Sequence, residues 1–562
     1  MPPKATKAAA SKAASDAKKP AATKASAKTT SKAAATTKAT TSKAAAAKAV
    51  KKDEKPAKAS AKSGSQTDDK PVTNGAPSNK RKASETESEN EQDVVMEEPQ
   101  PKKTKTEKAP PRAAPAKAKK AVHVEIGKKI NEAPTQVLDI YVFGEGTSGE
   151  LGLGSKRVNG KKPIDVKRPR LNDNLSAKTV GVVQIACGGM HVAALTRDNK
   201  ILTWGVNDQG ALGRDTTWDG GLRDADNADD SDSEDEDDTG INPRESTPTA
   251  LSEEDFAPGT KFVQVVASDS ASFVLTEDGR VYGWGTFRSS DGILGFTETV
   301  KVQTRPVLLA GLKNIKALAS GANHILALDH KGNVVAWGCG QQNQLGRRII
   351  ERNKMSSLIP QGVGLPRGKI AKIACGSYHS FAIDNKGAVW GWGLNNFGEI
   401  GVENSAGEDD AVILKPVKIN FLADHTVTGI KGGIHHSLAC TDKGELFAWG
   451  RVDGYQVGFE LEAIEKVDED TKASISDVVA VAAGTDNSFA ISKDGKAYSW
   501  GFSSNYQTGQ GTIDDVHVPT LIDNTATRDK KIIAAGAGGQ FSVLIGIAED
   551  VPATNGEVNG VH

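Results

Sequence analysis

One short pattern recurs seven times from Tyr141 onward, and this repetition limits the possible folds more than any other feature. The pattern's first mark is an aromatic residue followed by glycine at the end of an apolar run. Successive marks lie 51–61 residues apart, except for one step of 80. The aromatic residues of the seven copies are Phe143, Trp204, Trp284, Trp337, Trp392, Trp449 and Trp500.

A second mark, a turn of small residues that often ends in histidine, also occurs seven times. It is found at residues 188–191, 268–271, 321–324, 376–379, 432–435, 484–487 and 538–541. Between the two marks lie an apolar run, a polar turn and a second apolar run, which together predict a β-hairpin. A third mark, such as residues 210–213 and 398–401, follows several of the aromatic-glycine pairs.

Each repeat therefore predicts a small antiparallel sheet that cannot bury both of its faces alone. Seven such sheets bury their faces by closing into a ring, so the sequence predicts an all-β, seven-bladed β-propeller over residues 134–548. The first repeat lacks the turn and the last lacks the aromatic-glycine pair. We therefore expect the N-terminal strands to complete the last blade.

The ends of the chain have a different composition. Residues 1–120 lack Phe, Trp and Tyr and carry 28 Lys and Arg against 13 Asp and Glu, a net charge of +15. Such a segment buries too little apolar surface to order itself, so residues 1–133 are predicted to be a disordered basic tail. We expect an acidic disordered insert at about residues 217–249 and a flexible C-terminus at residues 549–562.

Several kinds of chemistry are excluded. Residues 144–149 match a dinucleotide-binding fingerprint, but another copy of the repeat follows instead of a helix. Cys187 and Cys375 precede His191 and His379 at a ligand-like spacing, yet a closed zinc site needs four converging ligands. Both cysteines are predicted to be small core residues. The sequence predicts no metal, no cofactor, no covalent catalysis and no membrane span.

The three marks together resemble those of the regulator of chromosome condensation family, with the best matches at residues 205–216, 284–288, 338–347 and 432–436. The resemblance covers about residues 134–548. It implies a guanine-nucleotide exchange factor for the small GTPase Ran that acts on chromatin in the nucleus. The implied cellular roles are nucleocytoplasmic transport and the assembly of the mitotic spindle and nuclear envelope.

The same resemblance implies that residues 286–294 form a β-wedge aimed at the phosphate-binding loop of the GTPase. Asn323 stands where the family has an exchange aspartate, which replaces a charged contact with a neutral one. The residues implied to contact the GTPase are Asp269, Phe287, Arg288, Ser289, Ser290, Asp291, Gly292, Asn323, Arg347 and His435.

The basic segments predict further partners. Distributed lysines suit DNA phosphate and not base reading, and the family implies histone contacts just after Arg347. The residues expected to bind DNA or chromatin are Lys4, Lys7, Lys12, Lys18, Lys19, Arg348, Arg352 and Lys354. An import signal, read by a nuclear import receptor, is expected at Lys80, Arg81, Lys82, Lys102, Lys103 and Lys105. Modification is expected at Pro2, Ser231 and Ser233.

Two alternatives stay open at this point. The chain could be a chromatin-binding propeller scaffold without exchange activity, which the asparagine at position 323 makes conceivable. A repeat domain of a ubiquitin ligase is the other, but no catalytic partner domain is evident in the sequence. We expect a monomer that engages nucleotide-free, GDP-bound and GTP-bound Ran.

Overall fold

The computed structural model describes residues 125–219, 239–403, 406–408, 410–459 and 475–549. Several predictions lie outside these residues. They concern the modification sites Pro2, Ser231 and Ser233, the C-terminal residues 550–562, the DNA-binding residues Lys4, Lys7, Lys12, Lys18 and Lys19, and the import residues Lys80, Arg81, Lys82, Lys102, Lys103 and Lys105.

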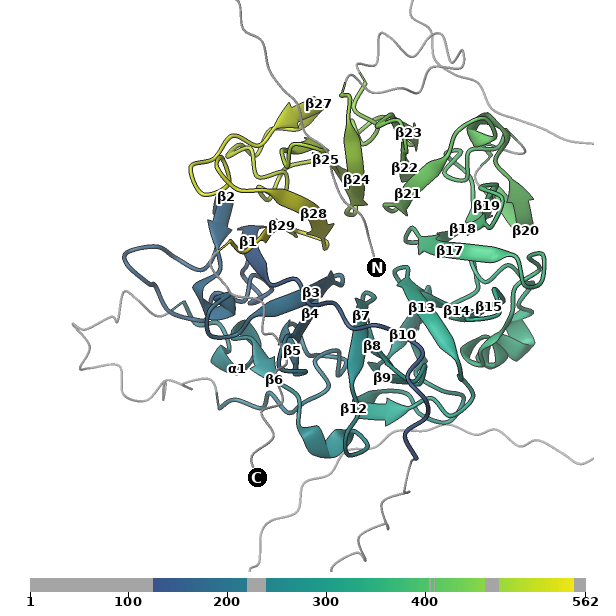
Figure 1. The fold of residues 1–562 in the computed structure, drawn as a ribbon, viewed down its shortest axis with the longest axis horizontal. Coiled ribbons are helices and arrows are strands. Elements are labelled where there is room, and N and C mark those ends of the chain that lie inside the picture. Colours follow the sequence, from purple (N-terminus) through teal and green to yellow (C-terminus); the bar gives the residue numbers. More distant parts are fainter. Residues whose placement is uncertain (1–124, 220–238, 404–405, 409, 460–474, 550–562) are drawn as a thin grey trace, which may run out of the picture. The chain divides into compact units, whose positions relative to one another are not determined.

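Seven antiparallel sheets are arranged around a common centre (Figure 1), which confirms the predicted seven-bladed propeller. Blade 1 combines β28 (Ile532–Ala537), β29 (Phe541–Ile547), β1 (Leu138–Gly144) and β2 (Val166–Leu171). Blade 2 contains β3 (Val182–Cys187), β4 (His191–Thr196), β5 (Ile201–Gly205) and β6 (Thr249–Ala250). Blade 3 contains β7 (Phe262–Ala267), β8 (Ala271–Thr276), β9 (Val281–Gly285) and β12 (Gln303–Leu308).

The remaining blades repeat this order. Blade 4 contains β13 (Ile315–Ser320), β14 (His324–Asp329), β15 (Val334–Gly338) and β16 (Gln361–Gly362). Blade 5 contains β17 (Ile370–Cys375), β18 (His379–Asp384), β19 (Val389–Leu394) and β20 (Val412–Lys418). Blade 6 has the described strands β21 (Val427–Gly432), β22 (His436–Thr441) and β23 (Leu446–Gly450). Blade 7 has β24 (Val478–Ala483), β25 (Asn487–Ser492), β26 (Ala497–Gly501) and β27 (Val516–Leu521).

Short helices connect some of these strands. They are η1 (Asp173–Leu175), α1 (Pro243–Ser246), η2 (Glu253–Asp255), η3 (Glu351–Leu358) and η4 (Asn420–Leu422). None of the helices in the described part of the chain is long and apolar enough to cross a membrane.

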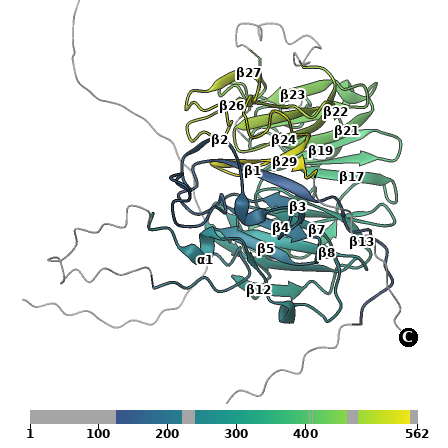
Figure 2. The same cartoon turned by 60° about the vertical axis from the view of Figure 1, so that its left-hand side comes forward.

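The ring closes as predicted, because β1 pairs with β29 over its whole length, from Leu138 opposite Ile547 to Gly144 opposite Phe541. The two strands lie side by side in both views (Figures 1 and 2). This pairing fixes the first part of the propeller to the last part with backbone hydrogen bonds. The ring therefore forms one continuous body.

The core lies between neighbouring blades. One apolar cluster joins blades 3 and 4 through Phe273, Ile325 and Trp337, and similar clusters join other adjacent blades. The aromatic residue of the first mark is buried in every copy, and four of the tryptophans are completely buried. Burying one such side chain contributes about 2–3 kcal/mol. The repeat thus supplies the contacts that hold the ring together.

Two predicted boundaries are wrong. Residues 125–133 were assigned to the tail, but Asn131 is buried and its side chain donates to the carbonyls of Thr276 and Ile315. The insert at residues 217–249 also ends earlier than expected, because residues 239–249 carry α1 and the start of β6. Asn242 caps α1 by accepting from the Arg244 amide, and Pro243 follows it. This cap and proline were visible in the sequence as a helix start.

Candidate functional site

One face of the ring carries all seven turns that join the first and second strands of each blade. In each turn the amide of the first residue donates to a carbonyl three positions later, as from Gly321 to His324 and from Gly376 to His379. Because the strands of a blade alternate in direction, the connection after each third strand reaches the same face. We call this surface the turn face.

The turn of blade 6 lies one residue later than predicted. The amide of Gly433 donates to the carbonyl of His436, so the repeat histidine is His436 and not His435. His435 therefore occupies the partly buried position that Asn323 has in blade 4. The doubled glycines and histidines of residues 432–436 made the two alignments indistinguishable by sequence.

The repeat histidines connect adjacent blades. The Nε2 atoms of His191, His324, His379 and His436 lie 2.8–2.9 Å from the hydroxyls of serines in the next blade. Each serine donates to a carbonyl that also accepts a tryptophan indole, as Ser380 and Trp392 both do at Gln344. These histidines are structural, since each one joins its turn to the next blade.

A separate hairpin rises from the connection after the third strand of blade 3. Its strands are β10 (Phe287–Ser289) and β11 (Gly292–Gly295), which pair with each other and with none of the other described strands. Ser290 and Asp291 form the exposed tip. Gly292 has a φ of 102° with open space around it, a conformation that favours glycine. We call residues 287–295 the wedge hairpin.

The base of the wedge hairpin is fixed in the core. Phe287 is completely buried and stacks at 6.0 Å from Phe273 and at 6.4 Å from Phe296, measured between ring centroids. The prediction that Phe287 contacts a GTPase is therefore wrong, because its ring has no surface to offer a partner. Its aromatic character, which suggested an exposed contact, instead anchors the hairpin.

Asn323 connects the hairpin to the adjacent turn. Its Oδ1 accepts from the Arg288 amide at 2.7 Å, and its Nδ2 donates to Oδ2 of Asp269 at 3.2 Å. These three residues, with Tyr378 and Gln341, line a cavity of about 640 Å³ on the turn face. Ser289 and Ser290 also line this cavity, so the structure brings together five of the residues selected by sequence.

Asp269 is held in an unfavourable environment for its charge. Burial of the carboxylate raises the pKa of Asp269 to about 6, although the Asn323 hydrogen bond and the Arg288 charge act in the opposite direction. Asp269 is nevertheless exposed to solvent at the edge of the cavity, so a cationic or hydrogen-bonding partner can reach its carboxylate and stabilise the charge. Asp269 is therefore suited to contact another molecule.

His435 lies on the same face, in blade 6. Its Nδ1 is 2.9 Å from Oε1 of the fully buried Glu399, which fixes the orientation of the ring. The ring lies 4.9 Å from that of Phe397, an exposed aromatic residue that the sequence interpretation missed. Phe397 directly precedes the third mark at residues 398–401, so its sequence context indicated only a repeat turn.

Arg347 does not present its guanidinium to the turn face. It donates to the carbonyls of Ala336 at 2.9 Å, Ser357 at 3.5 Å and Ile359 at 3.3 Å, and burial lowers its pKa to about 10. In the free protein the guanidinium is thus bonded within its own blade, and the GTPase contact of Arg347 stays a prediction. The guanidinium fixes the segment that contains η3.

The three cations after Arg347 differ in their surroundings. Arg348 and Arg352 are exposed, as a contact with another molecule requires. Lys354 is partly buried and forms ion pairs with Asp291 at 2.7 Å and Glu351 at 2.8 Å. In the free protein Lys354 therefore contacts the tip of the wedge hairpin, and its chromatin contact stays a prediction.

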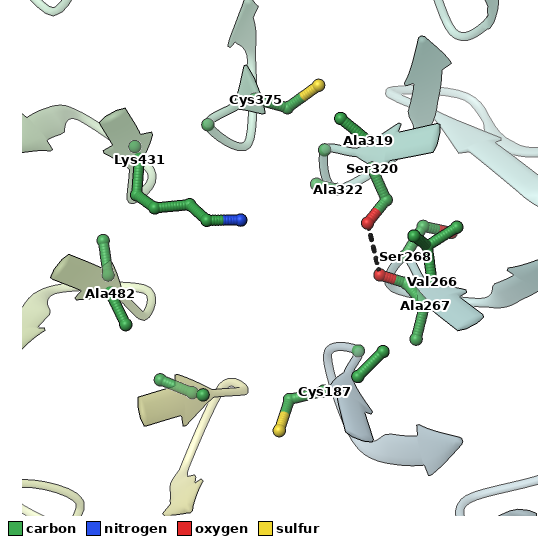
Figure 3. Close-up of a pocket in the computed structure, with 18 of the residues that line it drawn as sticks. Cys187, Val266, Ala267, Ser268, Ala319, Ser320, Ala322, Cys375, Lys431 and Ala482 are labelled. Atoms are coloured by element: carbon green, nitrogen blue, oxygen red, sulfur yellow. Dashed lines mark hydrogen bonds between the residues drawn. The ribbon is translucent and has the colours of Figure 1, made fainter. Parts of the chain in front are cut away.

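The channel at the centre of the ring has a volume of about 550 Å³ and is lined by the first strand of every blade. Figure 3 shows Lys431 and the thiols of Cys187 and Cys375 at its wall. Cys375 is also buried in the apolar cluster between blades 4 and 5, as predicted, whereas Cys187 is only partly buried and packs against the cluster of blade 1. Burial raises the pKa of both thiols to about 12. No group of three or more metal-ligating side chains occurs among the described residues.

The family model of the RCC1-like domain matches residues 139–544. The guanine nucleotide exchange factor SRM1 of Saccharomyces cerevisiae is 42% identical over 433 residues, which cover 73% of this chain and 88% of SRM1.

Two solved structures agree with this match. The first is Prp20p of Saccharomyces cerevisiae, described with its binding properties to Gsp1p and histones. It is 39% identical with a TM-score of 0.65, covering 74% of this chain and 93% of that one. The second is yeast RCC1 (Prp20) bound to Kap60, which is 37% identical with a TM-score of 0.65. The match covers 79% of this chain and 97% of that one.

Proposed function

The chain belongs to the family of the RCC1-like domain, and from this premise we propose that it is a guanine-nucleotide exchange factor for the small GTPase Ran. The observation that carries the proposal is the position of the wedge hairpin. It stands beside Asp269 and Asn323 at one cavity of the turn face, and His435 lies on the same face. The same face can therefore bind a GTPase and insert a rigid projection into it.

The mechanism needs no covalent chemistry. A GTPase holds its nucleotide through a phosphate-binding loop with backbone amides, a lysine and Mg²⁺. A projection that displaces this loop lowers nucleotide affinity without touching the nucleotide. Lowering that affinity by five decades requires about 7 kcal/mol of contacts made only with the nucleotide-free GTPase. Such a difference requires a broad interface, which the turn face can provide.

Individual residues receive different parts in this proposal. Asp269 offers its carboxylate to a cation or donor on the GTPase, while the exposed Arg288, Ser290 and Asp291 meet the displaced loop. Ser289 and Gly292 shape the tip. His435, oriented by Glu399, contacts the opposite side of the GTPase footprint.

Asn323 supports the wedge hairpin as well as the interface. Its amide can accept from the Arg288 amide and donate to Asp269 at the same time, which an aspartate cannot do. The neutral residue therefore keeps Asp269 paired in the free protein. We infer that the loss of one interface charge at position 323 is offset by this better ordered hairpin base.

We also propose that the protein acts on chromatin in the nucleus. The yeast relative Prp20p was studied for binding to histones, and yeast RCC1 (Prp20) was solved bound to Kap60. The basic tail, with 28 Lys and Arg against 13 acids in residues 1–120, suits DNA phosphate. The exposed Arg348 and Arg352 are proposed to contact histones, and the basic clusters at residues 80–82 and 102–105 an import receptor.

The test is the release of a fluorescent GDP analogue from Ran, measured by stopped flow with increasing concentrations of the full chain. We expect the rate of release to rise with the concentration of the chain and then to saturate. The nucleotide that rebinds to Ran should be whichever of GDP and GTP is in excess in solution. A rate equal to spontaneous release at every concentration would leave the chromatin scaffold as the function. An Asp269→Ala variant tests whether the turn face is responsible, because loss of this carboxylate should slow the release of GDP.

A further inference from the structure

The wedge hairpin is too small to hold its own orientation. It has three residues in β10 and four in β11, and isolated two-stranded hairpins of this size are marginally stable in water. Only its base is buried, at Phe287, Leu294 and Gly295. Between the hairpin and residues 339–357 lies a cavity of about 300 Å³, lined by Ser289, Leu294 and Ile349 among others. Apolar packing therefore does not support the tip.

Gln341 supports the tip instead, from the connection after the third strand of blade 4. Its Oε1 accepts from the Ser290 amide at 2.9 Å, and its Nε2 donates to the Ser290 hydroxyl at 2.8 Å. Two parallel bonds from one amide fix both the position and the rotation of Ser290. Gln341 lies between the aromatic-glycine pair and the third mark of its repeat, so its sequence position indicated only a connection.

Lys354 holds the neighbouring residue. Its Nζ lies 2.7 Å from Oδ2 of Asp291 and 2.8 Å from Oε1 of Glu351, so it joins the tip to η3. The lysine side chain is 37% exposed and that of Asp291 60% exposed. Solvent screens such a pair, whereas Gln341 makes two hydrogen bonds, also exposed, to a single residue of the tip.

We propose that Gln341 and Lys354 are positioning residues that hold the tip of the wedge hairpin in the orientation needed for exchange. This inference rests on the proposed function, since it assigns a role within the same site. The two side chains hold residues 290 and 291 before the GTPase arrives. Because the tip is already ordered, less conformational entropy of the tip is lost when it contacts the GTPase.

The first test measures order in the free protein and does not depend on activity. Hydrogen–deuterium exchange of a peptide covering residues 288–292 is compared between the full-length wild type and Gln341→Ala. We expect the Ser290 amide to exchange about tenfold faster in the variant, because its acceptor is gone, while the blades stay unchanged. Equal protection in the two proteins overturns the proposal.

The second test measures fluorescent GDP release from Ran as a function of Ran concentration. Gln341→Ala is expected to lower kcat about five- to tenfold, and Lys354→Met about twofold, with KM unchanged because docking on the rest of the turn face is intact. Lys354→Arg is expected to restore the rate, since arginine can pair with Asp291. Lys200→Met, which removes an ion pair to Asp198 at 2.7 Å in a hairpin turn of blade 2, serves as the matched control.

The outcomes separate the two levels of inference. If the wild type does not accelerate GDP release, the proposed function fails, whereas the exchange of the Ser290 amide still tests the support of the tip. If the wild type is active and Gln341→Ala matches it in kcat, the positioning role is wrong. A rise in KM with unchanged kcat also contradicts it, because that result assigns Gln341 to docking.

Discussion

Replacing Asp269 with asparagine should stabilise the free protein while it weakens exchange. The rise in the pKa of Asp269 from 3.8 to about 6 means that folding disfavours its charged form. A rise of this size corresponds to about 3 kcal/mol for a fully buried group. Asp269 remains exposed to solvent at the edge of the cavity, so screening reduces the expected effect to about 1 kcal/mol. Asn323 can still donate to the new amide oxygen.

The sign of the pH dependence follows from the raised pKa. The stability contributed by Asp269 is fully present below pH 3.8 and is lost as the pH rises through 6, because the folded state then has to hold the charge. The gain from Asp269→Asn should therefore be absent near pH 4 and complete by pH 8. Urea denaturation of the full chain across this range measures the difference between variant and wild type.

Asp278→Asn provides a control of opposite sign. Burial raises the pKa of Asp278, but the Thr276 hydroxyl, the Gly127 amide and Arg280 together hold it below its ordinary value. This variant should lose stability above pH 4. The reasoning about Asp269 is refuted if Asp269→Asn is no more stable than the wild type at pH 8, or if its difference is the same at pH 5 and pH 8.

Three other perturbations test separate parts of the structure. Asn323→Ala removes the hydrogen bonds to the Arg288 amide and to Asp269, so GDP release should slow about five- to tenfold by stopped flow with an unchanged circular dichroism spectrum. Burial lowers the pKa of His191, His324, His379 and His436 to between about 3 and about 4, so the stability of the ring should be full above pH 6.5 and fall towards pH 4. Urea denaturation at pH 5 should show a loss of about 1–2 kcal/mol per histidine, and constant stability from pH 7 to pH 5 would contradict this. Deleting residues 1–124 should weaken binding to duplex DNA and reduce its salt dependence, whereas equal affinity and equal slope would exclude the tail from DNA binding.

Much of the fold was predictable because the repeat encodes it locally. Each aromatic-glycine mark is a buried strand end, as Trp392 and Gly393 are at the end of the β19 pairing with His379. The missing marks at the two ends predicted the pairing of β1 with β29. The position of the segment around Asn131 was not predictable, because its contacts are individual polar bonds to distant residues of blades 3 and 4 that leave no periodic pattern.

The functional site was predictable in its location but less so in its chemistry. Asp269, Arg288 and Asn323 come together as expected, since the repeat fixes which positions reach the turn face. Phe287 was misassigned because sequence does not distinguish an exposed aromatic side chain from one that folds back into its own blade. Gln341 was missed because its partner, Ser290, lies 51 residues away in another blade.

The central claim is that the turn face binds the nucleotide-free GTPase in preference to the nucleotide-bound form. The most direct measurement compares the affinity of the full chain for Ran stripped of nucleotide with its affinity for Ran saturated with GDP. Because coupling between two ligands is reciprocal, the ratio of these affinities should equal the factor by which the chain lowers the affinity of Ran for GDP. Equal affinities for the two forms of Ran would contradict the account.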